Sequence, residues 1–269
     1  MYSISQWCGR FGNNIQQISN AIFYCMERNL IFNSPDNELI KKFRLEFGAE
    51  NCHSALFYFH VPSELGSGVP DFEIENVQKL SQMRREICKK YIYTHLKMDN
   101  YNILKLPEDT VVLHIRSGDI FSRKDYYCPV VSNYLQNPLS YYLRISEMYN
   151  KVLVLTEDYH NPVIDVLQKK SNTEIKILDV FETLQIMLGS TNIATSGVSS
   201  FGIACALLSE NVKKLHCSNL FIREILNYKD LENSDIEIDI TNIDQERYIK
   251  WNDWRNTDEQ RKLMIEYVL

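Results

Sequence analysis

Short runs of β-branched residues alternate with segments of helical periodicity through most of the chain after residue 110. The expected strands are 111–115, 152–155, 175–178, 193–195 and 214–217, and the expected helices between them are 140–149, a segment that begins at Pro162, 181–188 and 201–208. Strands that alternate with helices predict a parallel, doubly wound sheet. Such sheets bind ligands at the carboxyl ends of their strands, so the residues after each strand are the first candidates for a site.

The N-terminal part predicts a second, smaller lobe of similar design. We expect a strand at 2–7, a helix that begins near Asn13 or Asn14 and a strand at 30–33, followed by a polar, irregular region at 34–72, a long amphipathic helix from 74 to 95 and a linker at 99–109. The sequence therefore predicts an α/β protein of two Rossmann-like lobes with parallel sheets. Its expected parts are residues 1–105, residues 106–245 and a tail, 246–269, that ends in a helix at 258–268.

The composition excludes several classes of protein. The chain has 269 residues, of which 45% are hydrophobic and 24% are charged, as is typical of a globular protein. Its net charge of −6 argues against a nucleic-acid partner. The longest apolar runs are shorter than the roughly 20 residues of a membrane span, and the N-terminus lacks the pattern of a secretory signal. Seven scattered cysteines without a Cys-x-x-Cys pair indicate reduced thiols and no zinc site. We expect a cytoplasmic protein.

The strand at 111–115 leads directly into Arg116-Ser117-Gly118-Asp119. An arginine in this place offers a permanent charge and a planar set of donors that suits a phosphate. Gly118 allows a sharp turn or a close approach of the backbone to a ligand. The alternative is an ordinary surface arginine after a core strand.

Two further turns lie between an expected strand and an expected helix. The turn Gly9-Arg10-Phe11-Gly12-Asn13-Asn14 and the turn Ser196-Gly197-Val198-Ser199-Ser200-Phe201 each place small or polar residues at a helix N-terminus. Helix N-termini favour phosphate groups because their N–H donors and dipole attract anions. Each turn has a structural alternative, namely a tight turn with an asparagine cap in the first case and capping by serine in the second.

Acidic residues follow two of the expected strands. Asp158 and Asp179 could accept hydrogen bonds from a ribose or a base, or could cap the next helix, and capping fits Asp158 better than Asp179. The run Asp235-Ile-Glu-Ile-Asp239 imitates an acidic metal-binding pair, but its period of two favours a half-buried strand with a solvated face. His53 and His60 lie in the irregular region without a visible partner.

Taken together, the motifs resemble the fucosyltransferase superfamily, and most closely the bacterial α-1,2-fucosyltransferase-like enzymes. The matching blocks are Gly9–Asn14, His114–Asp119, and Asp179 through Leu184 and Met187 to Ser199–Phe201. The resemblance implies a GT-B-like fold with an inter-lobe cleft, a GDP-sugar donor such as GDP-fucose, a glycan acceptor, and metal-independent transfer with inversion and without a cofactor.

The resemblance also implies roles for particular residues. Arg116 would bind the diphosphate of the donor, with His114 in the same motif, and Asp179 would read the guanine. Ser199 and Ser200, with Phe201 after them, would hold phosphate. Residues 106–245 would form the lobe that binds the nucleotide sugar, and residues 1–105 the lobe on the acceptor side. The opening turn, with Arg10, Gly12, Asn13 and Asn14, would lie across the cleft from the donor. Arg116 and Asp119 are the expected catalytic residues; Asp125, Glu64 and His53 are further candidates for the base.

The chain also departs from this pattern. Ser117 stands where the α-1,2 enzymes carry a second arginine, Asn14 stands where they carry glutamine, and Phe201 is followed by Gly-Ile-Ala in place of tryptophans. A transferase for another nucleotide sugar, and a nucleotide-sugar-binding protein with a decayed site, therefore remain alternatives. A metal-dependent transferase that uses Asp235–Asp239 is a third.

Overall fold

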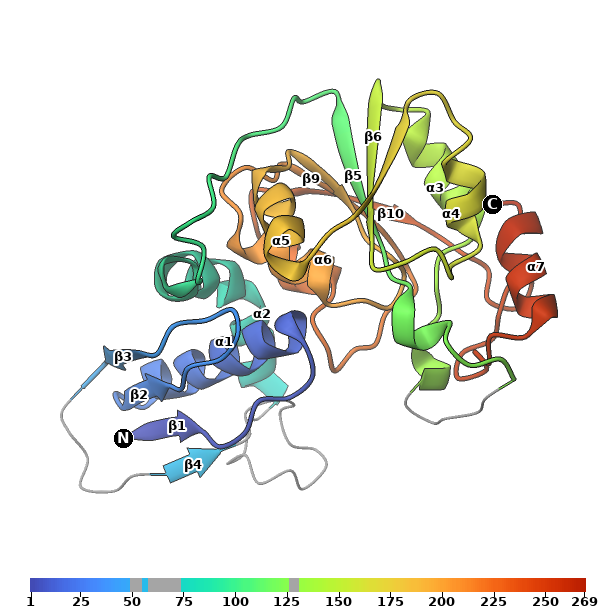
Figure 1. The fold of residues 1–269 in the computed structure, drawn as a ribbon. Helices are drawn as coiled ribbons and strands as arrows, with labels where there is room; N and C mark the ends of the chain where they lie inside the picture. The colour runs from blue at the N-terminus through green and yellow to red at the C-terminus, as the bar shows by residue number, and fades with distance from the viewer. Residues whose placement is uncertain (49–54, 58–73, 126–130) are drawn as a thin grey trace. The chain divides into compact units, whose positions relative to one another are not determined.

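The computed structural model describes residues 1–48, 55–57, 74–125 and 131–269, and these residues form two compact units (Figure 1). The first unit comprises Met1–Asn102, Ile203–Glu210 and Arg223–Ser234. The second comprises Ile103–Gly202, Asn211–Ile222 and Asp235–Leu269. Two segments of the first unit thus come from the range 106–245, which the sequence assigns as a whole to the second lobe.

The elements of the first unit begin at the N-terminus. In chain order they are β1 (Tyr2–Ile4), α1 (Phe11–Glu27), β2 (Ile31–Ser34), β3 (Phe43–Glu46), β4 (Ala55–Phe57), α2 (Ile74–Ile87), the π-helical turn η1 (Cys88–Ile92), and the 3-10 turns η2 (Tyr93–His95) and η5 (Tyr228–Leu231). The continuous helical segment from Ile74 to His95 confirms the long helix predicted there.

The sheet of the first unit is mixed, in strand order β3-β2-β1-β4. Strand β1 pairs in parallel with β2 and β4, whereas β3 runs antiparallel to β2 and aligns Glu46 with Ile31. The expectation of a parallel sheet is therefore wrong at β3. The expectation that residues 34–72 are irregular is also wrong for Phe43–Glu46, which form β3. In this strand a buried Phe43 and an exposed Arg44 begin a period-two pattern. Residues 49–54 and 58–73 of that region, with His53, His60 and Glu64, lie outside the described residues.

Helix α1 begins at Phe11, earlier than the predicted start near Asn13, and β1 ends at Ile4, earlier than the predicted Trp7. The helix starts early because Gly9 adopts φ +57° and turns the chain, and Arg10 at the N-cap is extended. The helix packs on β1, β2 and α2. The helical periodicity of its apolar residues was informative, since Ile15, Ile18, Ala21, Ile22 and Cys25 are all fully buried.

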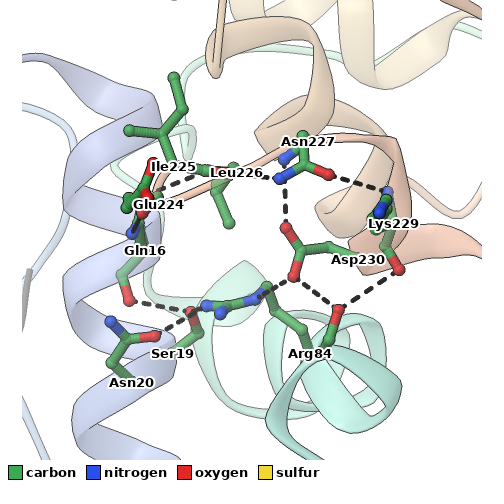
Figure 2. Close-up of polar contacts among 11 residues, drawn as sticks. Gln16, Ser19, Asn20, Arg84, Glu224, Ile225, Leu226, Asn227, Lys229 and Asp230 are labelled. Atoms are coloured by element: carbon green, nitrogen blue, oxygen red, sulfur yellow. Dashed lines mark hydrogen bonds and ion pairs between the residues drawn. The ribbon is translucent and has the colours of Figure 1, made fainter. Parts of the chain in front are cut away.

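A buried ion pair attaches the segment Arg223–Ser234 to the helices of the first unit (Figure 2). Arg84 of α2 donates to the Oδ1 atom of Asp230 at 2.9 Å and also to Ser19 and Asn20 of α1. Arg84 is 5% exposed and Asp230 is 9% exposed. Since a buried charge is costly without a partner, this pair requires η5 to stay against α1 and α2.

A second buried contact joins the same segment to α1. The Gln16 side chain donates to the carbonyl of Glu224 at 2.7 Å and accepts from the amide of Leu226 at 3.2 Å (Figure 2). An amide side chain that both donates and accepts in this way pairs with the backbone as a neighbouring strand would. These contacts explain why residues after 222 belong to the first unit.

The second unit contains the predicted alternation of strands and helices. Its elements are β5 (Thr110–Ile115), the 3-10 turns η3 (Gly118–Ile120) and η4 (Val131–Asn133), α3 (Leu139–Ser146), β6 (Lys151–Thr156), α4 (Val163–Leu167), β7 (Thr173–Ile177), α5 (Val180–Gly189), β8 (Asn192–Ala194), β9 (Lys214–Ser218), β10 (Glu237–Thr241) and α7 (Asp258–Glu266). Helix α6 (Phe201–Leu208) starts in the second unit and continues into the first.

All neighbouring strands of the second sheet are parallel, in the order β10-β9-β8-β5-β6-β7. Helices α3 and α4 lie on one side of this sheet and α5 lies on the other (Figure 1). The prediction of a parallel sheet between helices is confirmed for this unit, and the arrangement is compatible with a Rossmann-like fold.

The strand order reverses next to β5. The chain passes from β5 to β6 and β7 on one side, and then resumes at β8 on the other side of β5. Loops that leave two such strands diverge, which opens a crevice at their carboxyl ends. The second unit therefore has a topological switch point between β5 and β8.

None of the helices within the described ranges is long and apolar enough to cross a membrane. The five cysteines in these ranges carry free thiols, and Cys52 and Cys128 lie outside them.

Candidate functional site

The loops after β5 and β8 meet at the switch point of the second unit. The amide of Arg116 donates to the hydroxyl of Ser196 at 2.8 Å, and this hydroxyl in turn donates to Gln136 at 2.7 Å. Ser196 and Gln136 are fully buried. Two segments that are 80 residues apart, and that the sequence predicts as phosphate-binding turns, are thus brought together.

The guanidinium of Arg116 lies over the ring of Tyr134, 4.3 Å from its centroid, and 3.3 Å from a carboxylate oxygen of Asp119. The Arg116 side chain is 18% exposed, whereas that of Asp119 is 53% exposed. The ring and the carboxylate hold the guanidinium in place without enclosing it. An anionic ligand at this position would compete with the exposed Asp119 for the same donors.

His114, near the end of β5, stacks on Phe201 with ring centroids 4.7 Å apart. Its Nδ1 atom is buried and has no hydrogen-bond partner among the residues that the structure describes. Burial, and then the nearby charge of Arg116, lowers the pKa of His114 to about 4. The ring is therefore neutral at pH 7 and can offer a ligand a hydrogen bond but no charge.

A set of hydrogen bonds fixes the loop that carries Arg116. The Ser117 hydroxyl donates to Asp158 and accepts from the amide of Asn161 at 3.0 Å, while the Asn161 side chain donates to the carbonyl of Arg116 at 3.0 Å. The amide of Gly118 donates to Asp158 at 3.2 Å. The loops after β5 and β6 are thereby joined, so that the backbone of Arg116 is held from two sides.

Asp158 is ionised within this set of contacts. Burial of its carboxylate raises its pKa, but hydrogen bonds from Ser117, His160 and Gly118 outweigh burial and leave the pKa below its ordinary value. Gly118 is required at its position because its φ is +56°, and because a Cβ atom there would lie 2.7 Å from a carboxylate oxygen of Glu157.

The loop after β8 carries the serine residues, and β8 pairs with β5 in the sheet. Ser199 is buried, and Ser200 and Phe201 are half-buried, with Phe201 as the first residue of α6. The N-terminus of α6, the positive end of its dipole, is therefore at the same edge of the sheet as Arg116, where the strands have their carboxyl ends. Gly197 adopts φ +52° and would meet the carbonyl of Leu135 if it had a side chain.

The structure reverses the expected preference for helix capping between the two carboxylates. Asp179 caps α5: it accepts from the amide of Glu182 at 2.8 Å, and Glu182 accepts from the amide of Asp179 at 3.3 Å. Asp158 caps no helix and instead holds the Arg116 loop, so the preference for Asp158 as the capping residue is wrong. Asp179 follows β7, which β6 separates from β5, and it is not brought to Arg116. A role for Asp179 in reading guanine stays a prediction.

The opening turn lies in the first unit, where its asparagines shape the backbone. The Asn14 side chain donates to the carbonyl of Cys8 at 2.9 Å and accepts from Asn37 at 3.2 Å. Gly12 is buried, Asn13 is half-buried and Arg10 is exposed. Asn14 lies in the first turn of α1 and stabilises the preceding turn by its hydrogen bond to Cys8. A contact of this turn with a ligand stays a prediction.

The acidic run near residue 237 forms the predicted strand, β10. Asp239 accepts from His216 at 2.8 Å and from Arg144 at 2.9 Å, and Ile240, in the same edge strand, is 40% exposed. Within the described ranges, His, Cys, Asp and Glu side chains form no group of three or more that could hold a metal ion. Asp125 is exposed, with φ +53°.

Sequence reasoning did not place Tyr134 or Asn161 beside Arg116. Tyr134 is one of several tyrosines in the sequence that could stack on a sugar ring or pack in the core, and Asn161 follows an expected strand closely enough to be a candidate. A pocket of about 250 Å³ also lies beside Asp119 in the second unit. Its lining residues are Asp119, Ile120, Ser122, Arg123, Trp254, Arg255 and Asn256.

Comparisons with protein-family models, with curated proteins and with solved structures found no match to this chain.

Proposed function

We propose that this protein is a glycosyltransferase that moves a sugar from a nucleotide-diphosphate donor, most simply fucose from GDP-fucose, to a glycan hydroxyl. In this proposal the anomeric centre is inverted, no metal ion or cofactor takes part, and the enzyme acts in the cytoplasm. The GT-B-like arrangement, with the opening turn facing the donor across a cleft, is part of the same proposal.

One observation carries the proposal. The amide of Arg116 is bonded to Ser196, so that a guanidinium, a serine-rich loop and the N-terminus of α6 gather at the switch point of a parallel sheet. Phosphate groups are bound in this kind of crevice because cationic side chains and the helix dipole attract them together. The donor diphosphate would take the place of the Asp119 carboxylate as the partner of Arg116.

The reaction would proceed as a direct displacement. The acceptor oxygen attacks the anomeric carbon, the bond from that carbon to the diphosphate breaks, and the bonding electrons leave with the diphosphate. Arg116 stabilises the negative charge that develops there, an effect that is worth roughly a hundred-fold or more in rate for a single well-placed donor. Asp119 is the proposed base that takes the proton of the acceptor hydroxyl.

A second candidate is a protein that binds nucleotide sugars without transferring them. Ser117, which stands in place of the second arginine of similar enzymes, is fully buried, and its hydroxyl is bonded to Asp158 and Asn161. It therefore brings no charge to the leaving group. Slow or absent turnover with intact binding would favour this candidate.

The first experiment measures the melting temperature of the protein with GDP, UDP, CMP and GDP-fucose, with and without EDTA. A ligand that binds only the folded state raises the melting temperature by mass action. We expect a shift with GDP compounds that persists in EDTA and is lost in Arg116→Ala. Arg247→Gln, which removes an exposed guanidinium from the same unit, is the matched control and should retain the shift.

Release of GDP from GDP-fucose then separates the two candidates. Turnover in the wild-type protein that falls by a hundred-fold or more in Arg116→Ala supports the transferase. A shift with UDP or CMP compounds would keep the transferase and change the donor. If no nucleotide shifts the melting temperature, both candidates are refuted.

A further inference from the structure

Strand β7 forms one edge of the parallel sheet in the second unit. The amide of Val152 in β6 donates to the carbonyl of Asn172, the residue just before β7. The backbone groups of successive strand residues point to opposite sides, so every second residue from Asn172 onward faces β6. Ile175 and Ile177 therefore direct their N–H and C=O groups away from the sheet. Among the residues that the structure describes, these outward groups have no hydrogen-bond partner.

The side chains of β7 form two rows of different character. Thr173, Ile175 and Ile177 lie on one face of the strand, and Ile177 is 46% exposed. Glu174 and Lys176 lie on the other face, where their charged groups are 3.3 Å apart and both side chains are more than a third exposed. The edge thus presents an apolar row centred on Ile175 and, on its other face, an acid followed by a base.

This order of residues is suited to pairing with itself. In an antiparallel pair of two copies of β7 about a two-fold axis at Ile175, this residue lies opposite Ile175 of the second copy, and the two exchange both backbone hydrogen bonds. The outward amide of Ile177 then reaches the carbonyl of Thr173 of the second copy. The apolar rows of the two copies meet on one face, where they cover the exposed Ile177.

The same register sets opposite charges against each other. Glu174 lies directly opposite Lys176 of the second copy, and the two-fold axis repeats this pair, so acids and bases alternate around the axis. Side chains directly opposite in an antiparallel pair are close enough to interact. A register shifted by two residues in one direction would place Glu174 opposite itself, and a shift in the other direction would place Lys176 opposite itself. Both are unfavourable, so one register alone satisfies the backbone and the charges.

The other edge of the sheet, β10, is not self-complementary in this way. The amide of Glu237 donates toward β9, so Ile238 and Ile240 are the outward residues of this strand. A two-fold pair that uses both of them places Asp239 opposite itself. The match between outward backbone groups and opposite charges is thus a property of β7 and not of any edge in this sheet.

We propose that β7 is an interaction surface for a second copy of this chain, and that two chains form an antiparallel, two-fold dimer whose sheets are continuous across the axis. An exposed sheet edge with apolar side chains is a ready template for such pairing. One short strand supplies the interface, so the dimer is weak and its population depends on protein concentration. Since β6 separates β7 from β5, dimerisation does not depend on the proposed nucleotide-sugar site.

The test exchanges charges across the axis and measures association by sedimentation velocity over a range of protein concentrations. Glu174→Lys sets bases opposite each other, and Lys176→Glu sets acids opposite each other. We expect each variant to dimerise about thirtyfold more weakly than the wild-type protein, because both symmetry-related pairs become repulsive. An equimolar mixture of the two variants restores opposite charges at both pairs. The mixture should therefore recover the association that each variant loses alone.

A backbone variant and a control complete the experiment. Ile177→Pro removes an outward amide that the sheet itself does not use, and proline is tolerated at such edge positions, so it should weaken the dimer while the protein stays folded. Glu237→Lys reverses a charge on the opposite edge, where the side chain is 68% exposed, and it should leave the dimer unchanged. Circular dichroism verifies the fold of each variant.

Recovery of the dimer in the mixture of Glu174→Lys and Lys176→Glu, together with its loss in each variant alone, supports the proposal. A wild-type protein that stays monomeric up to about 1 mM overturns it. A dimer that persists in both charge variants, or a mixture that associates no better than its components, also overturns it. Loss of the dimer in Glu237→Lys but not in Glu174→Lys would place the interface at β10 and refute the role of β7.

Discussion

Replacing Arg84 by methionine removes the cation of the buried network in the first unit while it keeps an unbranched side chain of similar length. In the wild-type protein Arg84 donates to Asp230, Ser19 and Asn20, and both ions of the pair are at least nine-tenths buried (Figure 2). The substitution leaves the Asp230 carboxylate without a cationic partner. It also takes a donor from each of the two polar side chains on α1.

The magnitude follows from what Asp230 retains. It still accepts from the Ser81 hydroxyl at 3.0 Å and from the amide of Asn227 at 3.1 Å, so the carboxylate keeps part of its solvation. Removal of one partner of a buried ion pair costs about 3–5 kcal/mol. We expect Arg84→Met to lie near the lower end, at about 3 kcal/mol of unfolding free energy.

The assay is urea denaturation followed by circular dichroism, with Lys79→Met as the control. Lys79 lies on the same helix and pairs with Glu27 at 2.9 Å, but its side chain is 52% exposed. An exposed pair contributes about 0–1 kcal/mol, so the control should shift the midpoint little. At a slope of about 3 kcal/mol/M, the Arg84 variant should unfold about 1 M urea earlier.

A double-mutant cycle with Asp230→Asn tests the reasoning directly. Neutralising the aspartate removes the unpaired charge, so Arg84→Met should cost less in that background than in the wild-type protein, with a coupling of 1 kcal/mol or more. Arg84→Met would contradict the argument if it cost no more than Lys79→Met, or if the two substitutions were simply additive.

Three further predictions concern the Arg116 loop and two residues beside it, His114 and Asp158. Gly118→Ala should destabilise the protein by about 1–3 kcal/mol in urea denaturation, because alanine is strained at φ +56° and its Cβ atom meets Glu157. The control is Gly202→Ala, which should cost less because Gly202 has an ordinary φ and the nearest contact of the added Cβ atom would be 3.3 Å. The pKa of His114 is about 4 in the folded protein, below its unfolded value of about 6.5. Lowering the pH from about 6.5 to 4 should therefore reduce the unfolding free energy of the wild-type protein by about 3 kcal/mol relative to that of His114→Gln. A difference between the two proteins that stays constant across that pH range would refute this prediction. Because the pKa of Asp158 is lower in the folded protein, its ionised carboxylate stabilises the fold at pH values above its unfolded pKa of about 4. The stability that the wild-type protein has over Asp158→Asn should therefore be lost as the pH falls through the folded pKa. Unfolding curves of the two proteins that differ equally at pH 7 and pH 3 would contradict it.

Much of the second unit could be predicted from local patterns. Val111 to Leu113 is an apolar run of strand-forming residues. These three side chains and Ile115 are fully buried in β5, with His114 half-buried between them. The helix Phe201–Leu208 was predicted at its observed ends. Such predictions succeed because the period of two in strands and of 3.6 in helices is a property of neighbouring residues.

Other features depended on residues that are distant in the chain. Strand β3 forms because β2 offers it an edge, which a period-two pattern of only four residues does not reveal. The capping box of Asp179 was available in the sequence as Asp-x-x-Glu, whereas the use of Asp158 was not, since it depends on Ser117 and Gly118 41 and 40 residues earlier. Local hydrogen bonds can be read from spacing, but contacts between loops cannot.

The sequence by itself determined that the chain from residue 110 forms a parallel sheet between helices, and that Arg116 and Ser196 each follow a strand. Only the tertiary structure decided that β8 lies next to β5, so that the two residues share a hydrogen bond. It also decided that Asp230 pairs with Arg84 in the first unit. The physical reason is that the order of strands and the pairing of buried charges follow from competition among all segments for the same core, whereas periodicity depends only on adjacent residues.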